Sequence, residues 1–188
     1  RTPQIQRQTC IRSHMGAPKG VWRQSLPPEA CDQLISNLLN LNCWPIWHAS
    51  AGRILSEHNG TLHEGQRFDL HRVERQRLIE EMWTVKSIRQ SERPRFLEIE
   101  FEWGGQQREG RPLGTAITSL RLAVTVWGEE EGGIEIAAWW QVRWWAKFMQ
   151  GRVNRLPRAL AKQWLRDASE RGIHTIPDSH EAALGESE

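Results

Sequence analysis

The stretch that most constrains the fold is the amphipathic segment from Arg143 to Gly172, near the carboxy end of the chain. Apolar side chains recur in it every three or four residues and cationic side chains collect on the opposite side, a pattern that predicts a long helix with one buried face. The apolar set is Trp145, Phe148, Met149, Val153, Leu156, Leu160 and Trp164, and the cationic set is Lys147, Arg155, Arg158, Lys162 and Arg166. Such a helix needs a broad apolar surface to lie on.

Pro157 interrupts this segment. In the middle of a helix, proline lacks the backbone donor and its ring crowds the carbonyl four residues earlier, here that of Val153, which costs about 3 kcal/mol unless the helix bends. We therefore expect a kink or a break within residues 154–157, giving either one bent helix or two abutting ones.

The preceding part of the chain has the alternation of strands. Leu97, Ile99, Phe101 and Trp103 alternate with glutamates, which predicts a strand with one buried and one solvated face across residues 95–103. Further strands are expected at residues 19–25, 53–58, 65–73, 78–88, 115–127 and 133–142. Asn59-Gly60 is a strong turn dipeptide, and GEEEGG at residues 128–133 joins the last two strands. Hairpin-length connections predict an antiparallel sheet, which the terminal helix would cover.

Two short helices are expected after the first strand. Pro27, Pro28 and Glu29 suit a helix opening, because proline is tolerated in the first turn and an acid favours the positive end. This helix is predicted to run to about Asn42, and Pro45 then permits a second one carrying Trp44 and Trp47. Residues 1–17 are interpreted as a flexible arm, 18–172 as the domain and 173–188 as a flexible tail, with residues 104–114 forming a polar connection.

Composition excludes several functional classes. The 188 residues are 38% hydrophobic, enough for one well-filled domain. A formal charge of +2, from 25 basic and 23 acidic residues, does not indicate nucleic-acid binding. The first residues of the sequence lack the apolar core of a signal peptide, there is no 18-residue apolar run, and the three cysteines lack CxxC spacing, so we expect a cytoplasmic protein with reduced thiols.

Sequence motifs for cofactor, metal or nucleophile chemistry are missing. There is no dinucleotide or phosphate-binding glycine loop and no nucleophile elbow, so no cofactor is expected. His58, His63 and His71 have no spacing typical of a metal site, so no metal is expected either.

Four pieces of sequence, taken in order, carry a family resemblance. They are SLPPEACDQLISNLLNLNCWPIW at residues 25–47, GTLHEGQRFDL at 60–70, GTAITSLRL at 114–122, and the terminal helix. Together they resemble the START-like superfamily, also called SRPBCC, which includes polyketide cyclases, ubiquinone-binding proteins, lipid-transfer domains and birch-pollen allergen relatives. The likeness covers about Val21 to Gly172. The chain departs from the commonest pattern in its 104–114 connection, its eleven tryptophans and Pro157.

The resemblance implies an α+β helix-grip fold. In that fold a curved antiparallel sheet of about seven strands wraps around a long carboxy-terminal helix, two short helices follow the first strand, and a deep apolar cavity lies between sheet and helix. It implies a protein that holds a ligand, but no particular reaction, since one fold hosts many functions.

With this fold assumed, strand parity places Glu81 inward beside Ile79 and Trp83. Burial among apolar groups would favour the protonated carboxyl group, which could act as a general acid or base, or could bind a ligand hydroxyl. Alternatively, a twist turns Glu81 outward, or Arg72 on the preceding strand neutralises it. An inward Arg72–Glu81 pair would anchor a polar head group.

The candidate ligand-binding residues follow from the same parity and from the resemblance. They are Trp44, Trp47, His48, Phe68, Leu70, Arg72, Trp83, Phe101, Thr118, Trp140, Trp145, Phe148 and Leu156. His48 is expected at the mouth of the cavity, where it either meets a ligand or is simply exposed. Thr118 either offers a hydroxyl or is an ordinary strand residue, and the tryptophans either fill the core or contact a ligand. Trp139 and Trp140 must face opposite ways, so at least one indole lies outside the core.

Three functions compete. The first is binding of a hydrophobic or aromatic small molecule, or a lipid, in the cavity for carriage or sequestration. The second is an enzyme of the polyketide cyclase or aromatase type that moves protons through Glu81. The third is a membrane-associated or partner-binding module that uses the tryptophan and arginine surface of the last helix, with peripheral membrane contact.

Overall fold

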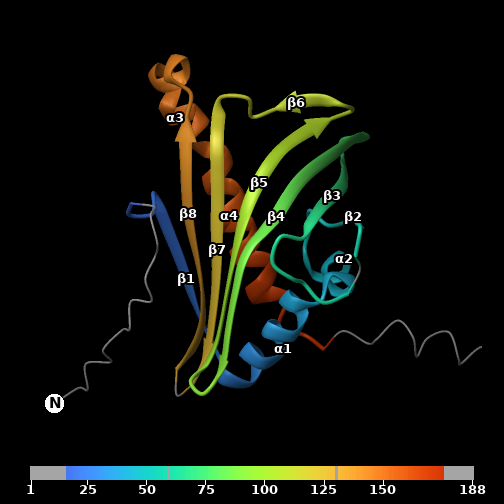
Figure 1. The fold of residues 1–188 in the computed structure, drawn as a ribbon, viewed down its shortest axis with the longest axis vertical. Coiled ribbons are helices and arrows are strands. Elements are labelled where there is room, and N and C mark those ends of the chain that lie inside the picture. The colour runs from blue at the N-terminus through green and yellow to red at the C-terminus, as the bar shows by residue number, and fades with distance from the viewer. Residues whose placement is uncertain (1–15, 59, 130, 176–188) are drawn as a thin grey trace, which may run out of the picture.

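The computed structural model describes residues 16–58, 60–129 and 131–175 (Figure 1). In chain order the elements are β1 (Gly20–Leu26), α1 (Pro28–Leu39), η1 (Leu41–Cys43), α2 (Trp44–Trp47), β2 (Arg53–Ser56), β3 (Arg67–Glu74), β4 (Arg77–Glu92), β5 (Arg95–Arg108), β6 (Arg111–Leu113), β7 (Ile117–Gly128), β8 (Gly132–Val142), η2 (Trp144–Met149), α3 (Gln150–Val153) and α4 (Arg155–Glu170). The elements η1 and η2 are 3₁₀ helices. Asn59 of the predicted turn, most of the arm 1–17 and most of the tail 173–188 lie outside the described residues.

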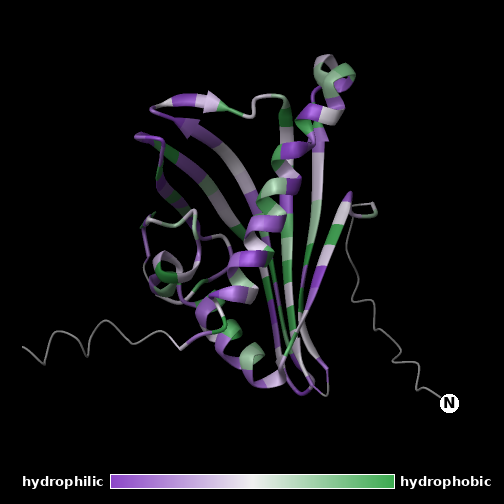
Figure 2. Cartoon of the chain, turned by 180° about the vertical axis from the view of Figure 1, so that it is seen from behind, coloured by the Kyte–Doolittle hydropathy of each residue, from purple (hydrophilic) through white to green (hydrophobic). Residues whose placement is uncertain are grey.

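The strands form one antiparallel sheet in the order β1-β8-β7-β5-β4-β3-β2, with β6 paired to β5. The sheet curves, and α4 crosses its concave face while α1 lies at its lower end (Figures 1 and 2). The predicted α+β helix-grip architecture is confirmed. The first helix also opens as predicted, with Pro28 at its start and Glu29 in its first turn.

The connection at residues 104–114 was expected to be a polar loop, and that expectation is wrong. β5 continues to Arg108, turns at Glu109 and Gly110, and returns as β6. Both turn residues have positive φ angles, 51° for Glu109 and 75° for Gly110, and glycine adopts such an angle without strain. Gly104 and Gly105 do not end the strand, because they lie beside Met82 where the β4–β5 pairing shifts register.

The carboxy-terminal segment breaks where predicted, at Asn154 between α3 and α4. The Trp140 indole N–H donates to Asn154 Oδ1 at 2.8 Å, which ties the break to β8. Pro157 lies in the first turn of α4, where its missing N–H has no intrahelical acceptor to lose. The prediction of one buried apolar helix face is wrong at the amino-terminal end of the segment. Trp145 and Phe148 belong to η2, beyond the end of the sheet, and are exposed.

The core lies between the sheet and the helices. Leu34 and Leu38 of α1 and Leu160 of α4 are buried, with α1 packed on β7 and β8 and α4 on β8 and β1. The Asn37 side-chain amide donates to the carbonyls of Gly172 and His174, which fastens the chain after α4 onto α1. None of the helices within the described ranges is long and apolar enough to cross a lipid bilayer.

Candidate functional site

The inner face of the sheet changes character along its length. At its lower end, buried aliphatic residues such as Leu97 and Ile99 of β5 line it. In the middle, Phe68, Trp83 and Trp103 sit side by side on β3, β4 and β5. Towards the upper end the next inward row is Leu70, Glu81 and Gln106. Polar groups are therefore concentrated at the end where β3 finishes and β4 begins.

An aromatic cluster fills the middle of the domain. Its members are Trp44, Trp47, His48, Phe68, Trp83, Phe101 and Trp164. Trp164 of α4 is central, with ring centroids 5.4 Å from Trp44, 5.1 Å from Trp83, 5.0 Å from Phe101 and 4.9 Å from His48. Most of the contacts are tilted or edge-to-face, which aromatic rings prefer over face-to-face stacking. The cluster joins α4 to the sheet and to α2.

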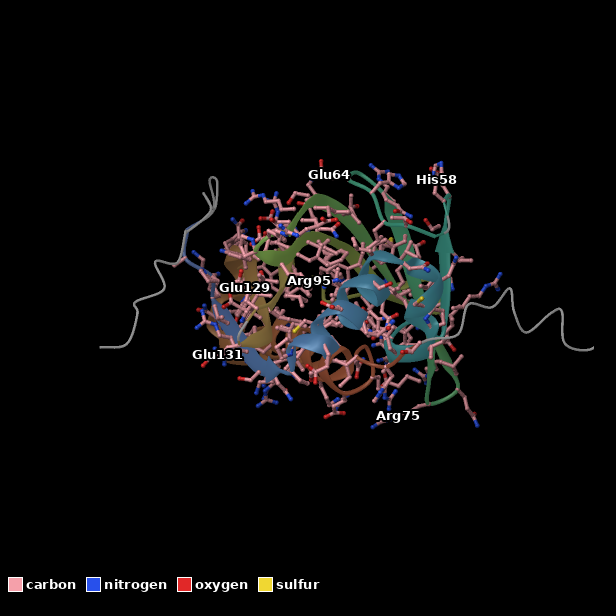
Figure 3. All side chains as sticks on the ribbon, turned by 90° about the horizontal axis from the view of Figure 1, so that it is seen from below. His58, Glu64, Arg75, Arg95, Glu129 and Glu131 are labelled. Carbon is pink, nitrogen blue, oxygen red and sulfur yellow. The ribbon has the colours of Figure 1, made fainter. Side chains whose placement is uncertain are left out.

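The deep cavity implied by the resemblance is replaced by these rings. Figure 3 shows side chains meeting between the sheet and the helices. Two depressions formed by the described residues lie at the surface. One is lined by Glu57, His58, His63, Gly65, Gln66 and Arg67, the other by Lys19, Gln141, Val142, Lys147 and Gln150. Neither is lined by a member of the aromatic cluster.

Several N–H donors in and beside the cluster have no acceptor. They are the indole N–H groups of Trp47, Trp83, Trp103 and Trp164 and the Nε2 atom of His48. By contrast, the Trp44 indole N–H donates to the carbonyl of Leu38 at 3.1 Å. A buried donor without a partner costs about 1–3 kcal/mol, so this group of donors destabilises the closed packing.

His48 is not at a solvent-exposed mouth, as expected from the sequence, but is buried in the cluster. The Ser50 backbone N–H donates to its Nδ1 at 3.1 Å, which leaves the proton on Nε2. Burial, and secondarily the charge of Arg72, lower the pKa of His48 to about 3. The imidazole is therefore a neutral N–H donor and not a group that titrates near neutral pH.

A polar network borders the cluster. Glu81 is fully buried, and its Oε1 accepts hydrogen bonds from Arg72 and from the Gln106 side-chain amide, the latter at 2.9 Å. Arg72 also donates to Ser50 Oγ at 3.2 Å, and Gln163 of α4 donates to the same oxygen at 3.0 Å. Glu81 Oε2 has no partner. The carboxylate is thus held on one oxygen and free on the other.

The remaining sequence candidates separate into two groups. Trp140, Leu70 and, in part, Leu156 lie inside the domain. Thr118 does not, because a register shift between Ile117 and Ser119 makes it the extra residue of a bulge and turns it to solvent. The predicted placement of Thr118, Trp145 and Phe148 inside the domain is therefore wrong.

No protein-family model and no curated protein sequence matches the chain. Solved structures do. The structure of Ara h 8.0201 is 9% identical with a TM-score of 0.59, covering 82% of this chain and 96% of that one. A di-domain ARO/CYC protein, StfQ, from the steffimycin biosynthetic pathway is 15% identical with a TM-score of 0.55, covering 79% of this chain and 49% of that one. The chain has the START-like fold.

A third START-like neighbour is a Thalictrum norcoclaurine synthase point mutant in complex with a transition-state analogue. It is 12% identical with a TM-score of 0.50, covering 85% of this chain and 98% of that one. Identities this low carry the fold alone, so the chemistry of this START-like domain must be argued from its own residues.

Sequence reasoning missed three members of the polar network. Gln106 lies three residues after Trp103, an odd spacing that simple alternation places on the opposite face, and only the irregular pairing around Gly104 and Gly105 brings it inward. Ser50 and Gln163 come from a loop and a helix, and no strand pattern could have found them. Within the described ranges, no three His, Cys, Asp or Glu side chains gather as they would around a metal ion.

Proposed function

We propose that the protein binds a small, largely apolar ring molecule that carries hydrogen-bond acceptors, between the sheet and α4, for carriage or sequestration. The observation that carries the proposal is the set of partnerless N–H groups of Trp47, His48, Trp83 and Trp164 within one aromatic cluster. An apolar core without a binding role gains nothing from buried donors that lack acceptors.

The chemistry of the ligand follows from these donors. A carbonyl or ether oxygen placed among the indoles would convert unpaired donors into hydrogen bonds inside a region of low dielectric. A flat ring would replace the edge-to-face contacts that Trp164 now makes with Phe101 and Trp44 by similar contacts of its own. The cluster therefore favours a planar molecule with acceptor oxygens over a plain hydrocarbon of the same size.

The polar network would orient the other end of the ligand. Arg72 has a side chain 19% exposed, so it lies where the interior meets solvent, whereas Glu81 behind it is fully buried. The free Glu81 Oε2 is an acceptor for a ligand hydroxyl. Entry requires the rings of the cluster to part.

The neighbouring folds agree with this chemistry. The synthase structure holds a transition-state analogue, and the ARO/CYC protein belongs to the steffimycin pathway, so this architecture can accommodate small organic molecules. At these identities they support only that the fold can hold a small molecule, and the kind of ligand is argued from the residues of this chain.

A second candidate is a cyclase-like enzyme in which Glu81 moves a proton. The buried Oε2 has no hydrogen-bond partner and is the oxygen that could exchange a proton with a bound compound, which favours this candidate. The hold of Arg72 and Gln106 on Oε1 instead favours a fixed binding group. Replacing Glu81 by Gln separates the two: turnover of a bound compound would be abolished if Glu81 is the acid–base group, whereas only affinity would change under the binding proposal.

Native mass spectrometry of freshly purified protein tests the proposal. The expected result is an additional mass of a few hundred daltons that disappears under mild denaturation. A matched preparation of Trp83→Phe/Trp164→Phe should retain less of it, because two of the donors are removed while flat rings remain. Equal retention by both preparations would contradict the assignment of the indole N–H groups.

A further inference from the structure

One end of the molecule is both cationic and apolar. Residues 143–166 contain no acidic residue, and their cations are Arg143, Lys147, Arg152, Arg155, Arg158, Lys162 and Arg166. The first part of this stretch, residues 143–155, forms η2, α3 and the start of α4 and projects past the end of β8 (Figures 1 and 2). We call it the η2–α3 end.

Large apolar side chains on the η2–α3 end face solvent. Trp144 is 81% exposed, Phe148 is 83% exposed and Trp145 is 41% exposed. Trp144 and Phe148 both belong to the short 3₁₀ helix η2. Exposed aromatic rings of this size, with Lys147 between them and Arg152 close in sequence, are typical of surfaces that meet a bilayer interface.

The segment is held firmly in this position. The Arg143 backbone N–H donates to the carbonyl of Ala116, and its guanidinium Nε donates to the carbonyl of Thr115 at 2.8 Å. Ala146 of the same 3₁₀ helix is fully buried. The rings are therefore presented by an anchored platform, with Arg143 used in holding the platform to the sheet.

The surrounding charges select the partner. A depression of about 270 Å³ at the base of the η2–α3 end is lined by Lys19 and Lys147, whose ammonium groups suit a phosphate-bearing head group. The nearby hairpin tips carry Glu74 and Glu109, but each stands among arginines: Arg75 and Arg77 at one tip, Arg108 and Arg111 at the other. This end as a whole attracts anions.

The opposite end of the domain carries charges of both signs, with Arg95 at the β4–β5 turn. The β7–β8 turn lies at the lower end and carries Glu129 and Glu131, which Figure 3 labels in the view from below. An anionic surface would therefore attract the η2–α3 end more strongly than the lower end, where the charges are mixed.

We propose that the η2–α3 end docks on anionic lipid bilayers, with Trp144 and Phe148 inserted at the level of the head groups and Lys147, Arg152 and Arg155 on lipid phosphates. Indole rings settle at this depth because they are apolar with one polar edge. Each cation near the surface adds attraction that salt screens. This inference does not depend on the interior ligand.

Vesicle flotation of the full chain tests the proposal. Vesicles of phosphatidylcholine alone are compared with vesicles containing roughly 30% phosphatidylserine, at low salt and at high salt. The expected result is flotation with the anionic vesicles at low salt and its loss at high salt. Failure to float with anionic vesicles at low salt would overturn the proposal.

Two variants with matched controls locate the surface. Trp144→Ala/Phe148→Ala and Lys147→Glu/Arg152→Glu should each lower the partition coefficient by roughly tenfold or more. Ile46→Ala, another exposed apolar residue, and Arg53→Glu/Arg67→Glu, an equal charge change on β2 and β3, should leave it unchanged. Equal flotation of all four variants would place any binding elsewhere and overturn the proposal.

Sedimentation velocity provides a second measurement. The sedimentation coefficient of the protein should not rise with concentration through self-association at this face. An association that Trp144→Ala/Phe148→Ala abolishes is therefore not expected. If the protein shows one and does not float, the face is covered by a second copy of the chain and the lipid proposal is overturned. Circular dichroism of each variant, compared with the unaltered protein, shows that lost flotation does not come from lost folding.

Discussion

The indole rings of Trp83 and Trp164 lie 5.1 Å apart, one on β4 and the other on α4, and neither ring nitrogen has a hydrogen-bond acceptor. This pair joins the sheet to the helix that covers it. The ring faces make apolar contact, whereas the N–H groups at the ring edges have no hydrogen-bond acceptor. The ring contact stabilises the interface, the unpaired donors destabilise it, and a guest that brings an acceptor would remove the second effect.

The unpaired donors predict that replacing Trp164 costs less stability than replacing Trp44, although both indoles are buried in the same cluster. Trp44→Phe removes the hydrogen bond to the Leu38 carbonyl, whereas Trp164→Phe removes a donor that has none. Both lose similar ring area, so Trp44→Phe should lower the free energy of unfolding by about 1 kcal/mol more. Urea unfolding at neutral pH measures the difference, and a larger loss for Trp164→Phe would contradict it.

The buried ion pair predicts strong coupling between Arg72 and Glu81. Arg72→Met leaves a fully buried carboxylate held only by Gln106, and should cost about 3–5 kcal/mol of unfolding free energy. The double variant Arg72→Met/Glu81→Met should recover most of that loss. As a control, Arg89→Met breaks a part-exposed pair with Glu98 and should cost about 1 kcal/mol or less. Equal costs for the two single variants would show that the Arg72 pair is not desolvated as described.

The burial of neutral His48 predicts that the free energy of unfolding falls as the pH is lowered below about 6.5. Its pKa is about 3 in the folded protein against an ordinary value of 6.5, so the unfolded chain takes up the proton first. Its contribution is complete above about pH 6.5 and is lost as the pH falls toward 3, at up to about 1.4 kcal/mol per pH unit. The free energy of unfolding measured between pH 7 and pH 4.5 should therefore fall less steeply in His48→Gln. Parallel profiles for the two proteins would contradict the burial of a neutral imidazole.

The sequence predicted the fold well, because periodicity is set by which faces are buried. The alternation in residues 95–103, the proline opening of α1 and the break at Asn154 each have a local cause that is visible in the chain. The hairpin β5–β6 was missed because Gly104-Gly105 resembles a strand end, and only the partner strand shows that the pairing continues past it.

The candidate site was less predictable, because it depends on where alternation fails. Thr118 leaves the inner face at a bulge, and Gln106 enters it after an irregular stretch. Trp145 and Phe148 fit a helical stripe in sequence but extend beyond the sheet that would have buried them. That the rings of α2, β3, β4 and α4 would meet and fill the interior follows from three-dimensional packing, and no single segment encodes it.

The most direct test of the central claim is a comparison of two ligands by isothermal titration calorimetry. Chromone and naphthalene are similar flat bicyclic molecules, but only chromone has acceptor oxygens. One hydrogen bond from an otherwise unpaired indole predicts that chromone binds about tenfold more tightly, and that the advantage shrinks in Trp83→Phe/Trp164→Phe. Equal affinities for the two compounds, or no binding of either, would show that the buried donors do not serve a ligand.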